Sequence, residues 1–189
     1  MVAQPAAKMM TQDEFEQVIA LPENRDRLLE LIQGEIVEKM PTREHGIIAA
    51  NIASDIDRYL DEHAVSCVAV EARHRPADDR YNDFLPDVSV VLGDRPVERE
   101  GAANYLPDLC IEIKSPRDSL RGMSDKAAFY LAHGAQMVWL VYPELRIVEV
   151  LTPDERQLLT ENAVISGGEV LPEFTVTVER VFRRLQVTG

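Results

Sequence analysis

Charged side chains stand inside two otherwise apolar segments in the middle of the chain. The first segment begins with Pro86-Asp87 and continues VSVVL, and the second contains Glu112-Ile113-Lys114. Side chains alternate across a β-strand, so Glu112 and Lys114 would point to one face while Ile113 points to the other and packs on the core. Charges on an otherwise buried strand break the usual pattern, and such breaks are expected at functional sites.

Two carboxylates that meet at one place form a natural site for a hard divalent cation. Asp87 would join Glu112 if their strands are neighbours, and their charges would repel unless a cation is present. Mg²⁺ prefers oxygen ligands and keeps several waters, so Asp87, Glu112 and the Ile113 carbonyl would suffice to hold it, or Mn²⁺ in its place. Lys114 would then hold or deprotonate the attacking water. The predicted chemistry is hydrolysis of a phosphodiester bond.

Spacing alone leaves two other interpretations open. Pro-Asp is common at the starts of strands, and a Glu-x-Lys pair often lies on a solvated strand face. The same residues therefore fit a catalytically inactive protein that keeps the fold and works as a binding or regulatory module. Hydrolysis of a smaller phosphate ester is a third interpretation, which differs only in the size of the cleft.

Other common catalytic and metal-binding motifs are absent from the sequence. It has no Gly-rich phosphate loop, no pair of His at helical spacing beside a Glu, no paired Cys for zinc and no Gly-x-Ser-x-Gly elbow. Cys110 would lie on the Glu112 face, but no His follows it at catalytic spacing, so a nucleophilic thiol is not expected.

The composition is that of a soluble globular protein with an acidic surface. The 189 residues (21.3 kDa) contain 20 Lys+Arg and 33 Asp+Glu, a formal net charge of -13. This balance argues against a protein that coats nucleic acid by bulk electrostatic attraction, but not against an enzyme that meets phosphates through a bound cation. No apolar run approaches the roughly 18 residues of a membrane span, and the N-terminus lacks the pattern of a signal peptide. We therefore expect a cytoplasmic protein without a membrane contact.

The order of predicted elements indicates one α/β domain with a mixed sheet, over residues 11–189 after a frayed tail at 1–10. Helices are expected at 11–19, from Thr42 onward, and from Asp118 or Ser124 to Gly134. Segment 28–37 predicts a strand or a tight hairpin interrupted by Gly34. Further strands are predicted at 66–71, 86–92, 106–114 and 136–142, a hairpin at 146–160, and a last strand and helix within 174–185.

From about Leu28 to Leu185 the sequence resembles the Uma-two family, whose members are assigned as endonucleases. The resemblance implies the restriction endonuclease-like fold of the PD-(D/E)XK superfamily: a central mixed sheet flanked by helices, here with an additional C-terminal β-hairpin. It also implies Mg²⁺ dependence and cleavage of DNA. It is carried by ELIQGEIVEKMP (30–41), His45 at a helix start, FLPDVSVV (84–91), PDLCIEIKSPRD (107–118), DKAAFYLAHGAQMVWLVYP (125–143) and LPEFTVTVERVF (171–182).

The resemblance also assigns roles to individual residues. Asp87 matches the aspartate of the superfamily motif, Glu112 matches its second acid, and Lys114 stands at the lysine position. Many relatives carry an apolar residue there and a lysine in the following helix instead, and this chain has that lysine too, as Lys126. We expect Lys114 to act, because it would share a face with Glu112.

Two further site residues and a homodimer are implied in the same way. Glu35 matches an acid often suggested as an additional site residue, although it also fits an ordinary strand carboxylate. His45 could touch a phosphate or order a metal-bound water, or could simply hydrogen-bond at the helix start. Members of the superfamily commonly dimerise to cut two strands, and the C-terminal hairpin offers an interface. The basic clusters that could meet a DNA backbone are Arg73-His74-Arg75, Arg117 and Arg121.

Overall fold

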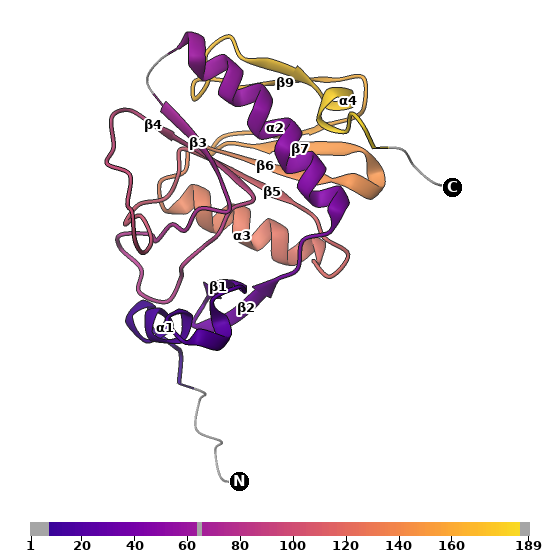
Figure 1. Ribbon diagram of the computed structural model, residues 1–189. Helices are drawn as coiled ribbons and strands as arrows, with labels where there is room; N and C mark the ends of the chain where they lie inside the picture. Colours follow the sequence, from indigo (N-terminus) through magenta and orange to yellow (C-terminus); the bar gives the residue numbers. More distant parts are fainter. Residues whose placement is uncertain (1–7, 64–65, 186–189) are drawn as a thin grey trace.

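A six-stranded mixed β-sheet forms the centre of the protein in the computed structural model, which describes residues 8–63 and 66–185 (Figure 1). Strands β5 and β6 are parallel, and the other neighbouring pairs of this sheet are antiparallel. The prediction of an α/β fold with a central mixed sheet is confirmed. In spatial order the strands are β3 (Ser66–Val70), β4 (Val88–Leu92), β5 (Leu109–Ile113), β6 (Met137–Tyr142), β7 (Ile147–Leu151) and β8 (Arg156–Leu159).

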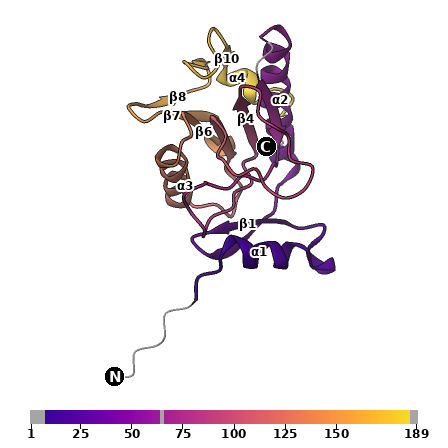
Figure 2. The same ribbon diagram turned by 90° about the vertical axis from the view of Figure 1, so that its left-hand side faces the viewer.

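Two helices cover opposite faces of this sheet, as Figure 2 shows. Helix α2 (Arg43–Glu62) begins where the Thr42 side chain accepts a hydrogen bond from the His45 N–H, as its sequence predicts. Helix α3 (Leu120–Ala132) is capped by Ser119, whose hydroxyl accepts from the Gly122 N–H. The expected start at Asp118 or Ser124 is wrong, because the Asp118 carboxylate accepts from the Ser115 N–H instead and closes a turn before the helix.

The sheet separates two apolar cores. On one side Ile111 and Ile113 pack in the cluster that contains Ile52 of α2, which confirms the predicted core face of β5. On the other side Tyr130 of α3 packs with Cys110 and its neighbours. Glu112 shares this second face and is buried under α3. The charged residue expected on that face of a buried strand is thus present, and the crossover from β5 to β6 carries a helix over it.

The register of β4 and β5 brings the two motif acids together. Val88 lies opposite Ile111, so the residue before β4 reaches the end of β5. There the Ile113 N–H donates a hydrogen bond of 2.6 Å to Asp87 Oδ2. The condition that the two strands be neighbours is met.

An N-terminal unit lies beneath the sheet in Figure 1, made of α1 (Gln12–Ile19) and a hairpin of β1 (Leu28–Ile32) and β2 (Glu35–Lys39). The hairpin alternative for this segment is correct: Gln33 and Gly34 both have positive φ, 51° and 77°, as a two-residue type I′ turn requires. Backbone hydrogen bonds between Leu31 and Asp83, of 2.8 and 2.9 Å, attach β1 to the segment that precedes β4. The hairpin is thereby held against the end of the sheet.

The chain before α1 contacts this hairpin. The Met10 N–H donates to the Gly34 carbonyl at 3.0 Å, so Met10 is already tied to the fold. The remainder of the expected tail, residues 1–7, lies outside the described residues. The capping box of α1 at Thr11 and Glu14 forms as predicted.

We expect Gly34→Ala to destabilise the protein more than Gly93→Ala. Both glycines have positive φ, 77° and 79°, so each alanine carries left-handed backbone strain of about 1–2 kcal/mol. At Gly34 the added Cβ would also lie 2.7 Å from Met9 Cβ, whereas nothing lies within 4 Å at Gly93. That overlap adds about 1–3 kcal/mol, measurable by urea unfolding of the two variants. Equal free energies of unfolding for the two would contradict the close approach of Met9.

The C-terminal part completes the fold. The predicted hairpin within 146–160 forms as β7 and β8 and joins the central sheet. Beyond it, β9 (Val164–Ser166) pairs with β10 (Thr175–Thr177), and α4 (Val178–Val181) packs on the core that contains α2. Among residues 8–63 and 66–185, no helix is long and apolar enough to cross a bilayer. Two short 3-10 helices, Pro22–Asn24 and Pro143–Leu145, complete the set of elements.

Candidate active site

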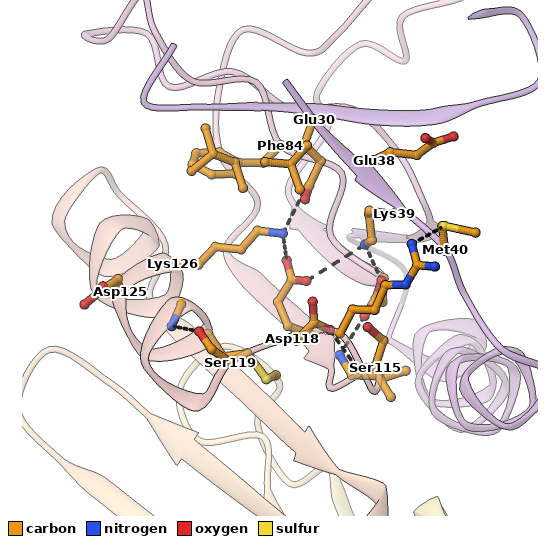
Figure 3. A pocket seen from close by; sticks show the side chains of 18 of the residues that line it. Glu30, Glu38, Lys39, Met40, Phe84, Ser115, Asp118, Ser119, Asp125 and Lys126 are labelled. Carbon is orange, nitrogen blue, oxygen red and sulfur yellow. Dashed lines mark hydrogen bonds and ion pairs between the residues drawn. The ribbon is translucent and has the colours of Figure 1, made fainter. Parts of the chain in front are cut away.

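A cleft of about 400 Å³ lies between the β1–β2 hairpin, the adjoining ends of β4 and β5, and the first half of α3 (Figure 3). In Figure 3, Lys126 extends into it from α3 and Lys39 from the hairpin on the other side. Its titratable lining includes Glu30, Lys39, His45, Asp87, Glu112 and Lys126. Two of the predicted site acids and one of the two predicted lysines therefore share one cleft.

Asp87 is held in place by groups from three elements. Its Oδ2 accepts from the Ile113 N–H at 2.6 Å and lies 2.9 Å from His45 Nε2, and its Oδ1 forms an ion pair with Lys39. Burial alone would raise the pKa of this carboxyl. The hydrogen bond from His45 and the charge of Lys39 outweigh that effect, so the pKa of Asp87 lies well below its usual range. The Asp87 side chain is a fixed anion at the floor of the cleft.

Glu112 has two partners that Asp87 lacks, Tyr130 and Lys126. Its Oε1 accepts a hydrogen bond of 2.7 Å from the Tyr130 hydroxyl and lies 2.9 Å from Lys126 Nζ. Burial raises the pKa of Glu112, and the nearby charge of Asp87 adds to that effect; the ammonium of Lys126 opposes both without cancelling them. The two acids are thus unlike in proton affinity although they face the same cleft.

Lys126 joins Glu112 to a third acid, Glu30. Lys126 Nζ donates to Glu30 Oε1 at 2.7 Å, and the same oxygen accepts from the Leu85 N–H at 2.8 Å. Burial would lower the pKa of Lys126, but the carboxylates of Glu112 and Glu30 outweigh it and raise that pKa above its ordinary value. Lys126 therefore stands in the cleft as an ammonium ion.

Glu30 and Lys39 were not found by reasoning from the sequence. For Glu30 a signal exists: it is a lone carboxylate between Leu29 and Leu31, both buried, which is the same break of pattern that marks Glu112. Lys39 offers no such signal. The other side chains of β2 are exposed, so a lysine at its end resembles any solvated strand residue.

Lys114 and Glu35 do not reach the cleft. Lys114 follows the last residue of β5, Ile113. Its Nζ donates to the Ser115 carbonyl at 3.2 Å and it is not among the lining residues. Glu35 is exposed at the turn end of β2 and does not line the cleft either. Ile113 lines it and contributes its N–H to Asp87.

The donor set suits a hard divalent cation. Within the part of the chain that the structure describes, no three His, Cys, Asp or Glu side chains form a ready metal-binding group. Asp87 and Glu112 nevertheless direct carboxylate oxygens toward the same ammonium, that of Lys39, which lies 3.9 Å from Glu112 Oε2. Oxygen ligands that converge on one positive charge are the kind that Mg²⁺ prefers, so the residues fit the ion in chemical type.

The arginines of the basic cluster Arg73-His74-Arg75 form ion pairs within the fold. Arg73 Nη2 lies 2.5 Å and Arg75 Nε 2.8 Å from Oδ2 of the fully buried Asp83, and both arginines also contact Glu16 of α1. Arg117 is different, since it lines the cleft. Of these basic residues, Arg117 is thus the one placed to meet a ligand there.

Comparisons with known proteins agree with this architecture. A family model described as "Putative restriction endonuclease", Uma2, matches residues 13–179. A crystal structure of a protein described as "a putative nuclease belonging to DUF820", from Anabaena variabilis ATCC 29413, superposes with a TM-score of 0.78 at 28% identity. The match covers 92% of this chain and 97% of that one. The comparison with curated proteins gives no match. Since the family model spans most of the sequence and the nuclease fold is shared over nearly its whole length, the chain belongs to the Uma2 family.

Proposed function

We propose that this protein is a divalent-metal-dependent endonuclease that hydrolyses phosphodiester bonds of DNA, with Mg²⁺ as the natural ion and Mn²⁺ as a substitute. The observation that carries the proposal is the meeting of Asp87, Glu112 and an ammonium from Lys126 in one cleft of a Uma2-family chain. Two carboxylates with a neighbouring lysine are suited to hydrolysis of a phosphate ester.

Asp87, Glu112 and the Ile113 carbonyl would hold the metal ion. When bound, the metal polarises a phosphate oxygen and lowers the pKa of an attacking water. The His45 ring and the Ile113 N–H fix the orientation of the Asp87 carboxylate. The Tyr130 hydroxyl does the same for Glu112.

Lys126 is better placed than Lys114 for the role of the catalytic lysine. Its Nζ lies 2.9 Å from Glu112 and it lines the cleft, whereas Lys114 binds the Ser115 carbonyl outside it. A protonated Lys126 would orient the attacking water beside Glu112 and stabilise the negative charge that develops on the phosphate. Glu30 positions this ammonium.

A catalytically inactive binding or regulatory module is the second candidate. It is favoured by the pairing of each motif acid with an internal cation, Asp87 with Lys39 and Glu112 with Lys126. The net charge of -13 also opposes the approach of DNA.

A homodimer that cuts both strands remains part of the proposal for an active enzyme.

Cleavage of closed circular plasmid DNA tests the proposal. Mg²⁺ or Mn²⁺ should convert the plasmid to nicked or linear form, and EDTA should stop the reaction. Asp87→Asn should lower the rate by about 10³-fold, because a bound metal supplies several kcal/mol of transition-state stabilisation. The asparagine still offers an oxygen to the Ile113 N–H, and its amide nitrogen would face Lys39, so the rate is measured where circular dichroism shows the variant folded.

Asp108→Asn is the matched control. Asp108 precedes β5 as Asp87 precedes β4, is likewise buried, and accepts from the Leu92 N–H at 2.8 Å, but it does not line the cleft. Its variant should cleave at the wild-type rate. No cleavage by the folded wild type with either metal, on single- or double-stranded DNA, would favour the inactive module.

A further inference from the structure

Lys39 lies between the two acids proposed to bind metal. Its ammonium pairs with Asp87 Oδ1, lies 3.9 Å from Glu112 Oε2, and donates to the Leu85 carbonyl at 2.6 Å. The side chain is 13% exposed, whereas the other residues of β2 are open to solvent. Lys39 is therefore the one side chain of β2 that is turned inward, onto Asp87 and Glu112.

Lys126 does not share this position. It binds Glu112 through Oε1 and Glu30 through Oε1, and its ion pairs do not include Asp87. Lys39 contacts the other Glu112 oxygen together with Asp87. Of the two ammonium ions in the cleft, Lys39 is the one that already joins the proposed ligands to each other.

A divalent ion shared by Asp87 and Glu112 would meet the Lys39 ammonium at the same oxygens. Two positive charges at such a distance repel strongly in a partly desolvated cleft. Lysine carries its charge on a flexible four-carbon stem, and Lys39 is the last residue of β2, beside the exposed Met40. Its side chain can therefore leave the carboxylates without unfolding the hairpin.

We propose that Lys39 is an internal cation that occupies the metal position of the metal-free protein, and that the divalent ion replaces it on binding. This inference rests on the proposed metal-dependent function. Without metal, the Lys39 ammonium neutralises two buried carboxylates that would otherwise repel each other. The apparent metal affinity equals the intrinsic affinity multiplied by the fraction of molecules in which Lys39 has left the site. Lys39 thus sets the metal concentration at which the site fills and DNA cleavage can begin.

Chemical labelling of the wild-type protein tests the replacement directly. An amine-reactive reagent is applied with and without saturating Mn²⁺, and each lysine is quantified by peptide mass spectrometry. If Lys39 has left the carboxylates in fewer than about 10% of metal-free molecules, its labelling should rise about ten-fold or more when Mn²⁺ is added. Lys126 should stay protected in both states, and Lys8, whose side chain is 82% exposed, should be labelled in both.

Calorimetric titration of Lys39→Met with Mn²⁺ is the second measurement. Methionine keeps much of the lysine stem and removes the charge, so the variant should bind Mn²⁺ about ten-fold more tightly than wild type, or more. Its melting temperature without metal should be lower, and Mn²⁺ should raise it further than in wild type. Lys114→Met, which alters a lysine outside the cleft, should match wild type in both respects.

The outcomes separate this inference from the proposed function. Saturable Mn²⁺ binding with unchanged Lys39 labelling overturns the replacement and leaves metal dependence intact, even if Lys39→Met binds more tightly through its altered charge. Binding by Lys39→Met but not by wild type also overturns the replacement, because the ion then does not displace Lys39 in the wild-type protein. Absence of Mn²⁺ binding in both proteins overturns metal dependence and the role of Lys39 together. If Lys39→Met does not fold, the wild-type labelling decides.

Discussion

Glu112→Gln is expected to lower metal-dependent DNA cleavage by about 10³-fold, since a carboxylate that holds the metal contributes several kcal/mol to transition-state stabilisation. Glutamine has nearly the same shape and still offers an oxygen to the Tyr130 hydroxyl, which now donates to Glu112 Oε1 at 2.7 Å. The negative charge is the main change. Initial rates of plasmid nicking and Mn²⁺ titration by calorimetry measure the effect, and both activity and metal binding should fall.

Glu149→Gln is the control for that substitution. Glu149 is also a buried strand glutamate that accepts from a tyrosine, Tyr142, at 3.0 Å, and its ion pair is with Arg156. It lies outside the residues that line the cleft. Its variant should keep the wild-type rate and metal affinity. A Glu112→Gln protein that still binds Mn²⁺ as wild type does would remove Glu112 from the proposed ligands.

Lys126→Met is expected to reduce cleavage by about 10²–10³-fold, because it removes a preorganised positive charge from the reacting phosphate and water. The change also leaves Glu112 and Glu30 without their shared cation. Breaking a buried ion pair by removing one partner costs about 3–5 kcal/mol, so the variant should unfold at lower urea as well. Cleavage is therefore compared at a temperature where circular dichroism shows the variant folded.

Lys114→Met discriminates between the two lysines. Its ammonium binds the Ser115 carbonyl outside the cleft, so its loss should leave the cleavage rate within about three-fold of wild type and stability within about 0.5 kcal/mol. This order reverses the one expected from the sequence. A larger loss of activity in folded Lys114→Met than in folded Lys126→Met would restore Lys114 as the acting lysine.

Features set by local chemistry could be predicted from the sequence. Thr11 and Thr42 cap their helices as expected, because the signal lies within one turn of the chain. Ile111 and Ile113 face the core because alternation holds inside a strand. The same rule did not place Lys114 in the cleft: this residue lies just beyond the end of β5, and its side chain binds the Ser115 carbonyl instead.

The rest of the site depends on contacts between distant segments. The burial of Glu112 follows from the helix that crosses over it, and a strand pattern says nothing about what covers its charged face. Lys39 enters the cleft because the hairpin is attached to the rest of the fold through Leu31 and Asp83. The residues next to Lys39 in the sequence do not indicate that attachment. Acids on adjacent strands could be inferred in advance. The cations that neutralise them could not, with the exception of Lys126, which the family resemblance indicated.

The docking of the β1–β2 hairpin also has a consequence for the order of folding. Glu30 and Lys126 are 96 positions apart in the chain, and Lys39 and Asp87 are 48 apart. Contacts of such separation require the closure of long loops, which carries an entropic cost that local elements do not bear. The sheet pairs β3–β4 and β6–β7 join segments much closer in sequence. The cluster of acids and lysines is therefore expected to assemble late, so that an incompletely folded chain during synthesis would not yet possess a formed hydrolytic centre.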